Sequence, residues 1–325
     1  MGEAMLEVKD LRVDFDTKNG RVTAVSGVSF SLEKNKTLGI VGESGCGKSV
    51  SMLSILKLLP ARTSHIGAET SIKLNGQEIS QWSNRAMCKI RGRDISMIFQ
   101  DPMTSLNPVM TVGRQVSETF RVHQSIGKEA AWRASVEMLR SVGISEPEKR
   151  MRSYPHQLSG GMRQRVMIAM ALACRPAVLI ADEPTTALDV TIQAQILELM
   201  RELKRQISTS IILITHDLGV VAEMAEDILV MYAGEVVEQG SAADIFNNPL
   251  HPYTRGLMES IPRLEVDRER LNTIRGAVPD LSQMPKGCRF CERCAHATPR
   301  CSAQRPELTG RDGHLVRCFM CQGGL

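Results

Sequence analysis

Eight residues have the types and spacing of a phosphate-binding loop. Gly42-Glu43-Ser44-Gly45-Cys46-Gly47-Lys48-Ser49 fits the pattern G-x-x-x-x-G-K-S. Glycines let backbone N–H groups turn toward a phosphate, and the N-terminus of a following helix adds positive charge. Lys48 would then reach the β- and γ-phosphates, and the Ser49 hydroxyl would bind Mg²⁺. A plain glycine-rich turn is the alternative, but an apolar run before the loop and a helix-like stretch from Val50 favour a nucleotide site.

Two carboxylates follow an apolar run later in the chain. Residues 177–181 predict a buried parallel strand, and Asp182 and Glu183 come at its end. Such a position lies beside the nucleotide crevice of a doubly wound sheet. We expect Asp182 to hold Mg²⁺ through water, and Glu183 to orient and deprotonate the attacking water. The alternative is a surface acidic pair that caps the strand.

A second glycine element precedes a long helix-compatible stretch. Ser159, Gly160 and Gly161 stand before residues 163–175, which predicts another helix N-terminus able to meet an anion. One triphosphate does not need two such termini from the same chain. Either two phosphate sites exist or each nucleotide is shared between two chains. A simple helix cap by Ser159 remains the alternative.

These elements, taken together, resemble the ATP-binding cassette (ABC) family. The phosphate loop, Gln100 after a strand, Leu158–Gln164, Asp182-Glu183, Ala187-Leu188-Asp189 and His216 occur in the order of that family over residues 37–240. The resemblance implies an ATPase that forms a head-to-tail dimer. ATP on Gly42–Ser49 and Val50 of one subunit would be covered by Ser159-Gly160-Gly161 of the other.

The same resemblance implies roles for single residues. Gln100 would sense Mg²⁺ and the attacking water, His216 would contact the γ-phosphate, and Asp189 would couple the two sites. Phe15 matches the aromatic residue that stacks on adenine. The alternative is that Phe15 is a core residue of an edge strand, which would give the same sequence pattern. A signalling GTPase is disfavoured, because the Asn35-Lys36 pair is followed by Thr37-Leu38 and lacks the Asp that reads guanine.

A narrower resemblance is to the ATPase subunits of bacterial dipeptide and oligopeptide importers. It rests on four segments: Phe99–Pro108, Tyr154–Gln157, Met231–Gly234 and His251–Thr254. It implies that ATP hydrolysis powers peptide import through two separate permease subunits, which receive solute from a substrate-binding protein. The second ATPase subunit would be a paralogue, giving a heterodimer, or another copy of the chain. Residues 101–120 are the expected permease-contacting surface, with ordinary solvated loop and helix as the alternative.

Six of the nine cysteines crowd into residues 288–321. Cytosolic thiols stay reduced, so the cluster favours a metal site over disulfides. Cys288, Cys294, Cys301 and Cys318 have the x5, x6, x16 spacing of importer ATPases that bind a 4Fe–4S cluster. Cys291 and Cys321 depart from that spacing and create two C-x-x-C pairs, which indicate Zn²⁺ instead. Iron–sulfur, zinc and no metal all remain open. Separately, Cys46 stands at a helix N-terminus, where a low thiol pKa and reactivity are expected.

The order of expected elements predicts an α/β fold. Strands alternate with helices, which is typical of a mainly parallel sheet. The full prediction is a P-loop ABC nucleotide-binding domain at residues 1–246, with a parallel core, an antiparallel β subdomain and a helical insertion at about 101–175. Residues 247–325 are predicted to form a separate module that carries the cysteine cluster, because Pro, Gly and Cys increase there.

Composition and charge exclude several classes of protein. The 325 residues are 42% hydrophobic and 23% charged, as in soluble globular proteins. Residues 1–262 hold 29 basic and 29 acidic residues, so the body lacks the basic face that nucleic-acid binding needs. Neither a secretory signal nor a membrane-spanning run is recognisable. We therefore expect a cytosolic chain, and the resemblance implies a peripheral protein on the cytoplasmic side of the inner membrane.

Two alternatives to peptide import remain open at this stage. Nickel or glutathione import uses closely similar sequences. A soluble, non-transport ABC ATPase of DNA repair or translation is the main rival from another class, but such proteins commonly carry a long coiled coil or two cassettes in one chain. Neither feature is recognisable here.

Overall fold

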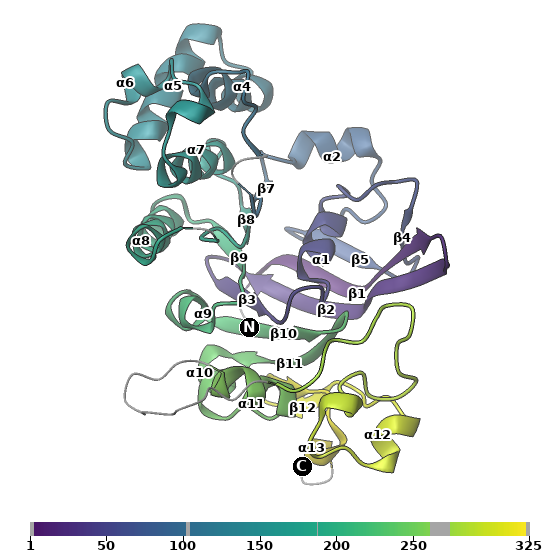
Figure 1. Cartoon of the computed structure of the whole chain (residues 1–325). Coiled ribbons are helices and arrows are strands. Elements are labelled where there is room, and N and C mark those ends of the chain that lie inside the picture. The colour runs from purple at the N-terminus through teal and green to yellow at the C-terminus, as the bar shows by residue number, and fades with distance from the viewer. Residues whose placement is uncertain (1–2, 102–104, 187, 261–273, 323–325) are drawn as a thin grey trace. The chain divides into compact units, whose positions relative to one another are not determined.

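The computed structural model describes residues 3–101, 105–186, 188–260 and 274–322, which fall into two compact units (Figure 1). Unit 1 comprises Met1–Met5, Leu32–Lys36 and Gln81–Ile214, and unit 2 comprises Leu6–Ser31, Thr37–Ser80 and Thr215–Leu325. Residues 102–104 of the expected permease-contacting surface and Ala187 of the predicted cassette motifs lie outside the described residues.

Unit 1 contains a parallel sheet of three strands, β7 (Ile95–Ile98), β8 (Val178–Asp182) and β9 (Ser210–Ile214). Every residue of β8 and β9 is buried, which explains why both read as uninterrupted apolar runs. Helix α8 (Val190–Ile207) joins β8 to β9 and buries one face that includes Ile196, Leu199 and Leu203. Its charged residues lie on the other face, as expected for an amphipathic helix.

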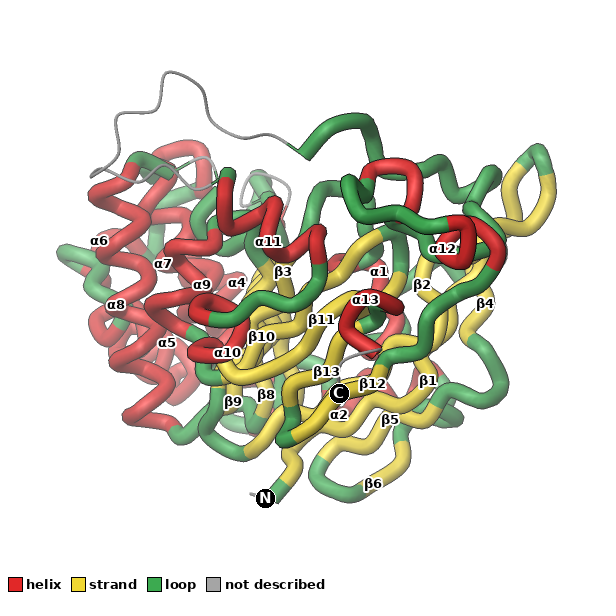
Figure 2. The backbone as a smooth tube through the Cα atoms, turned by 90° about the horizontal axis from the view of Figure 1, so that it is seen from below, coloured by secondary structure: helices red, strands yellow, loops and turns green. Residues whose placement is uncertain are grey.

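Helices α4 (Val112–Gln124), α5 (Lys128–Ser141), α6 (Pro147–Arg150) and α7 (Gly160–Leu172) of unit 1 lie together (Figures 1 and 2). Helix α2 (Asn84–Ile90) lies apart from them, and the short helix η1 (Pro155–Gln157) precedes α7 in the chain. A buried hydrogen bond joins the hydroxyls of Ser117 in α4 and Ser135 in α5 at 3.0 Å, so the polar atoms between these two helices are satisfied. The helical insertion expected within 101–175 is therefore present.

Unit 2 contains an antiparallel sheet at its N-terminal end. Its strands are β1 (Ala4–Thr17), β2 (Gly20–Glu33), β4 (Ser64–Ile66), β5 (Ser71–Leu74) and β6 (Gln77–Glu78), in the order β2-β1-β5-β6 with β4 also paired to β1. Leu6, Val8, Leu11 and Val13 of β1 are buried with 0–1% exposure. The polar and apolar residues of this strand thus face opposite sides over part of its length.

A second set of strands in unit 2 carries the phosphate loop. β3 (Thr37–Val41) pairs in parallel with β10 (Asp227–Tyr232), which pairs antiparallel with β11 (Glu235–Ser241). β13 (His314–Val316) then pairs with β11, and β12 (Thr309–Arg311) pairs with β13. The helices of these segments are α1 (Lys48–Ile55), α9 (Leu218–Met224), α10 (Ala242–Asn247) and α11 (Pro252–Glu259).

The last described segment packs onto these strands through aromatic rings. It contains η2 (Cys291–Arg293), α12 (Pro299–Ala303) and α13 (Phe319–Gln322), and the last two are labelled in Figure 2. The side chain of Gln322 in α13 donates a hydrogen bond to the Thr309 hydroxyl of β12. Phe290, 4% exposed, meets the ring of Tyr232 edge-on at 5.2 Å and that of Tyr253 at 5.5 Å. Edge-to-face pairs of this kind add to the hydrophobic gain of burial. The C-terminal segment therefore shares the core of unit 2.

One buried carboxylate fastens the same segment electrostatically. Glu235 of β11 is 2% exposed and makes ion pairs with Arg289, with Arg305 at 2.8 Å and with Arg317 at 3.5 Å. A buried charge is stable only when it is paired and hydrogen-bonded, so these three arginines and Glu235 must come together during folding. Three separate parts of residues 289–317 are thereby tied to one strand.

The structure has the combination of parallel strands, antiparallel strands and helices that the sequence predicts. The apolar run before the phosphate loop forms strand β3, and α4 and α5 fall within the helical insertion expected at about 101–175. Within the described ranges, no helix combines the length and the apolarity needed to cross a membrane.

Candidate nucleotide site

The phosphate loop connects β3 to α1 in unit 2, as the sequence predicts. Gly42 and Gly47 have φ angles of +150° and +97°, which are rarely accessible to other residues. A Cβ on Gly42 would also lie 2.2 Å from the carbonyl oxygen of Met231. The loop therefore needs glycine at this position, both for its backbone angle and because strand β10 runs directly against it.

Lys48 is the first residue of α1, and its side chain turns back across the loop. It is 6% exposed, and its Nζ donates to the carbonyls of Gly42 at 2.6 Å and of Glu43 at 3.0 Å. Ser49 and Val50 follow it in the first turn and are half-buried. The lysine, the hydroxyl and the backbone N–H groups that a triphosphate would need thus belong to one continuous segment.

Cys46 corrects one expectation. Its side chain is 0% exposed and its Sγ lies 3.7 Å from Lys48 Nζ. Burial raises the pKa of the Cys46 thiol, and this effect outweighs the opposing influence of the Lys48 charge. The expectation of a low pKa and a reactive thiol was wrong, because proximity to a helix N-terminus lowers a thiol pKa only where the thiolate is solvated.

Two contacts of Glu43 bring in residues that the sequence analysis did not assign to the site. Its N–H donates to the Tyr253 hydroxyl at 2.8 Å, and its carboxylate pairs with Arg293 at 2.6 Å. Tyr253 belongs to the His251–Thr254 segment, on which the resemblance to importer ATPases partly rests. The sequence therefore singled out this segment but gave Tyr253 no role in the nucleotide site. Arg293 lies between two cysteines, and nothing in the pattern of the phosphate loop points to it.

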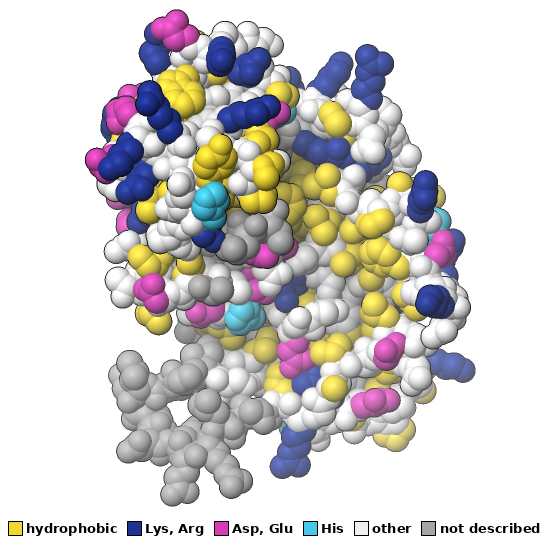
Figure 3. Space-filling view, turned by 45° about the horizontal axis from the view of Figure 1, so that its top comes forward, with side chains coloured by type: hydrophobic (Ala, Val, Ile, Leu, Met, Phe, Trp, Pro, Cys, Tyr) yellow, Lys and Arg dark blue, Asp and Glu magenta, His cyan; other side chains and the backbone are white. Residues whose placement is uncertain are grey.

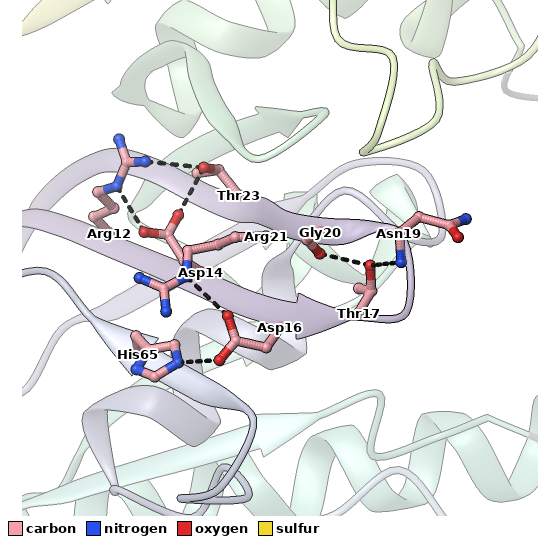
Figure 4. A network of polar contacts seen from close by, with 9 residues as sticks. All are labelled: Arg12, Asp14, Asp16, Thr17, Asn19, Gly20, Arg21, Thr23 and His65. Carbon is pink, nitrogen blue, oxygen red and sulfur yellow. Dashed lines mark hydrogen bonds and ion pairs between the residues drawn. The ribbon is translucent and has the colours of Figure 1, made fainter.

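Phe15 lies on β1 of unit 2 opposite Ser64 of β4, and its side chain is half-buried. Its neighbours Asp14 and Asp16 belong to a polar network (Figure 4). Asp14 accepts from Thr23 at 2.6 Å and from Arg12 at 3.1 Å, and Asp16 contacts Arg21 and His65. Because successive residues of a strand point to opposite faces, these contacts fix the strand while Phe15 faces the other side.

The network also lowers the pKa values of both aspartates. Burial alone would raise the pKa of Asp14, but hydrogen bonds from Thr23 and Arg12 outweigh it and lower the pKa. Hydrogen bonds from Arg21 and His65 lower the pKa of Asp16. Both carboxylates are therefore ionised at neutral pH, and the loop between β1 and β2 is held by charged as well as backbone contacts.

In unit 1 the structure brings two predicted catalytic residues together. Asp182, 4% exposed, ends β8, and Glu183 follows with a φ of +47° that turns the chain out of the strand. Glu183 Oε2 accepts from Gln100 Nε2 at 2.9 Å and from Thr186 Oγ1 at 2.9 Å, and its backbone N–H donates to the carbonyl of Ile214. The carboxylate that would act as base is held in one orientation by two donors.

The second glycine element also belongs to unit 1. Ser159 caps α7 by accepting from the N–H of Met162, while Gly160 and Gly161 open the helix. Gln164 of the same helix donates to the carbonyl of Pro184 at 2.5 Å, so α7 is tied to the segment that follows Glu183. Asp189 caps α8 through the N–H of Ile192 at 3.0 Å. The helix cap by Ser159 that the sequence analysis left as an alternative is therefore present.

His216 lies in unit 2, two residues after the end of β9. Its side chain is exposed. The next residue, Asp217, begins α9 as its cap and receives N–H groups from Gly219 and Val220. The predicted γ-phosphate contact thus stands just after a strand and just before a helix.

Five cysteines line one cavity in unit 2. Its volume is about 290 Å³, and its walls include Cys288, Cys291, Cys294, Cys301 and Cys318 together with aromatic and histidine side chains. Burial raises the pKa of Cys288 to about 11, and the neighbouring cysteines add to the increase. Cys321 contacts the carbonyl of Leu250 instead. Among the described residues, however, no three His, Cys, Asp or Glu side chains are arranged to hold a metal ion.

Two protein families match this chain. The family described as ABC transporter matches residues 25–186, and the family described as oligopeptide/dipeptide transporter, C-terminal region, matches residues 237–301. The second match includes Cys288, Cys291, Cys294 and Cys301 and ends before Cys318. The first contains the phosphate loop and the two carboxylates after β8.

Individual relatives are similar over nearly the whole chain. The oligopeptide transport ATP-binding protein OppD of Escherichia coli (strain K12) is 53% identical and covers 98% of this chain and 93% of its own. AppD and DppD of Bacillus subtilis (strain 168), described as oligopeptide and dipeptide transport ATP-binding proteins, are 51% and 52% identical. AppD covers 97% of this chain and 96% of its own length, and DppD covers 98% and 95%.

Solved structures show the same fold. The dimeric structure of MJ0796, a bacterial ABC transporter cassette, superposes with a TM-score of 0.64 at 27% identity and covers 73% of this chain and 99% of its own. A dimeric post-hydrolysis state of the same cassette, bound to ADP and phosphate, gives 0.65 at 26% identity and the same coverage.

The burial of Cys46 predicts that it is protected from thiol reagents. We expect iodoacetamide to modify the exposed Cys88 well before Cys46, because the Cys46 thiol is both inaccessible and held protonated. Peptide mass spectrometry over a time course measures both rates in one sample. Modification of Cys46 as fast as Cys88 in the folded protein would contradict this prediction.

Proposed function

The chain belongs to the ATP-binding subunits of oligopeptide and dipeptide ABC transporters, and on that premise we propose that it hydrolyses ATP with Mg²⁺ to power peptide import through separate permease subunits. The observation that carries the proposal is the hydrogen bond of Gln100 to Glu183 at the end of β8, in a chain that also has an ordered phosphate loop. The relatives described as oligopeptide and dipeptide transport ATP-binding proteins favour this role over nickel or glutathione import and over a non-transport role.

Each residue of the site then has one task. The phosphates are bound by backbone N–H groups of Gly42–Ser49 and Val50 and by the side chain of Lys48. Phe15 stacks on adenine, and Ser49 and Asp182 hold Mg²⁺. Glu183 accepts a proton from the attacking water, Gln100 positions both that water and the metal, and His216 contacts the γ-phosphate. The support for the assignment to Glu183 is its orientation by Gln100 and Thr186.

The second glycine element favours a shared nucleotide. We infer that Ser159, Gly160 and Gly161 of one subunit cover ATP on the phosphate loop of another, and that Asp189 links the two sites. Support comes from the N-terminus of α7, whose positive dipole end suits an anion, and from the dimeric state of the MJ0796 cassette. The second subunit is a paralogue or another copy of this chain.

The permease contact belongs to unit 1 in this proposal. Ser105, Leu106 and Thr119 of the proposed surface line a groove of about 220 Å³, together with apolar side chains that include Phe99 and Met167. Phe99 is 41% exposed and Val109 80% exposed, and Figure 3 shows apolar side chains exposed among charged ones on the helices of unit 1. An exposed apolar surface with a charged rim is typical of a protein interface. This contact would hold the protein at the cytoplasmic side of the inner membrane.

The cysteine-lined cavity is the proposed site of a metal cofactor within a C-terminal module at 247–325. The four thiols with the importer spacing, Cys288, Cys294, Cys301 and Cys318, all line it, and their soft sulfur donors fit an iron–sulfur cluster or Zn²⁺. A bound metal would require these thiols to lose their protons and draw together.

Replacement of the proposed base separates binding from chemistry. We expect Glu183→Gln to lower ATP turnover by about 10²–10⁴-fold while ATP still binds, because the amide cannot accept the proton of water. Lys48→Ala is the contrasting variant and should lose nucleotide binding itself. Phosphate release and fluorescent-nucleotide titration measure the two properties. Near-normal hydrolysis by Glu183→Gln would remove Glu183 from this role.

A charge on the proposed permease surface should weaken assembly. We expect Val109→Glu to reduce co-purification of permease subunits from detergent-solubilised membranes by about tenfold, because a carboxylate would be desolvated in an apolar interface. Val122→Glu is the matched control, since Val122 is also exposed, at 64%, but lies beyond residues 101–120. Equal losses in both variants would argue against this surface.

Metal analysis of anaerobically purified protein distinguishes the cofactor alternatives. An iron–sulfur cluster should give iron and sulfide, and Cys288→Ser or Cys318→Ser should abolish both while Cys321→Ser leaves them unchanged. Zinc without sulfide, lost on replacing Cys291 or Cys321, would identify a zinc site. Cys88→Ser serves as the control for handling losses. Absence of both metals from the unmodified protein would contradict a resident cofactor.

A further inference from the structure

Arg293 connects the cysteine-lined cavity to the phosphate loop. It lies in η2 between Cys291 and Cys294, and its guanidinium forms a fork with the carboxylate of Glu43. The two bonds are Nη1 to Oε2 at 2.6 Å and Nη2 to Oε1 at 3.0 Å. Paired, parallel bonds of this kind combine charge with a fixed orientation. Residues 250 positions apart in sequence are thereby joined at the loop.

The fork is itself held firmly. The side chain of Arg293 is 6% exposed, its Nε donates to the carbonyl of Arg275 at 2.9 Å, and its Nη2 donates to that of Ile274 at 3.3 Å. The guanidinium also lies 5.6 Å from the ring centre of Tyr232. An arginine that is buried and hydrogen-bonded at three nitrogens cannot move far without losing several contacts.

Glu43 is held on its backbone as well as on its side chain. The Tyr253 hydroxyl, 0% exposed for the whole residue, accepts from the Glu43 N–H at 2.8 Å. The Glu43 carbonyl in turn accepts from Lys48 Nζ at 3.0 Å. Position 43 of the loop is therefore anchored by Tyr253 and Arg293, both of which come from the C-terminal part of the chain.

The loop pattern does not explain why a carboxylate stands at this position. Any residue is allowed at the second place of G-x-x-x-x-G-K-S, and an unpaired carboxylate close to a bound triphosphate would repel it. Pairing with Arg293 offsets this repulsion. It also lets Arg293 hold the loop in place through the Glu43 carboxylate. Glu43 is 29% exposed in its side chain, so solvent does not fully screen its charge.

We propose that Arg293 is a positioning residue for ATP binding, which sets the conformation of the phosphate loop through Glu43 and makes the cysteine-bearing segment part of the nucleotide site. This inference rests on the proposed function of the loop. Arg293 contacts neither substrate nor metal in this role. Arg293 holds Glu43, the second residue of the loop, and thereby sets the positions of the backbone N–H groups of residues 42–49.

The expected signature is a change in affinity without a change in chemistry. Loss of the fork loosens the loop and leaves a carboxylate beside the phosphates, which weakens ground state and transition state equally. Arg293→Ala should raise the ATP dissociation constant by about tenfold, and the KM with it, while kcat at saturating ATP stays within about twofold. Arg293→Lys keeps the charge but not the fork, and it should raise the ATP dissociation constant about threefold.

A double-mutant cycle shows whether the effect passes through Glu43. Glu43→Gln alone should raise the dissociation constant about threefold, because the amide keeps one acceptor oxygen but sets an NH2 donor against the second guanidinium N–H and so breaks the fork. In the Arg293→Ala background, Glu43→Gln should recover about threefold of the lost affinity, since it removes the unpaired charge. Fluorescent-nucleotide titration of the full chain gives all four values, and Arg300→Ala is the matched control, because Arg300 lies over the Phe319 ring of the same segment.

Several outcomes would overturn the proposal. Wild-type affinity in Arg293→Ala, additive effects in the cycle, or an equal loss in Arg300→Ala would each show that Arg293 does not act through Glu43. Melting curves without nucleotide monitor folding. If Arg293→Ala does not fold, Arg293→Lys decides, with a raised dissociation constant and unchanged kcat in favour and wild-type affinity against. Failure of the unmodified chain to bind ATP would instead refute the proposed function.

Discussion

Close contact between the phosphate loop and strand β10 is the constraint on which the rest of unit 2 depends. A Cβ at position 42 would collide with the carbonyl oxygen of Met231, so glycine is required there and β10 must stay in register with β3. The turn after β10 is just as close, since the Gly234 N–H donates to the Cys46 carbonyl at 3.0 Å. A segment that packs on β10 or β11 is therefore also held in position relative to the phosphate loop.

The C-terminal segment is fastened in this way by two kinds of force. Phe290 packs against both Tyr232 and Tyr253, whose rings also contact each other, and three arginines pair with the buried Glu235 of β11. The aromatic contacts supply apolar burial, and the ion pairs supply orientation, since a buried carboxylate tolerates few arrangements of its partners. A segment rich in proline, glycine and cysteine is thus ordered against the nucleotide-binding part of the chain. Its proposed metal site and the fork of Arg293 are consequences of the same packing.

In unit 1, local capping and catalytic orientation are combined. Ser159 and Asp189 each begin a helix, and Gln164 of the first helix reaches the carbonyl of Pro184 beside Glu183. A shift of α7 would therefore displace the segment that follows Glu183, the proposed base. The exposed apolar groove lined by Phe99 and Met167 is formed by the same helix and by β7, so that a partner bound in this groove would touch the elements that hold Gln100 and Glu183.

The sequence by itself determined the fold class, the phosphate loop and the carboxylates after β8, because apolar periodicity and the loop pattern are local properties of neighbouring residues. It did not reveal the burial that makes Cys46 unreactive or the fork between Arg293 and Glu43. It placed six cysteines together but could not arrange them, and in the structure five line one cavity while Cys321 contacts Leu250. Only the tertiary structure decided these points, since burial and long-range pairing depend on which distant segments pack together.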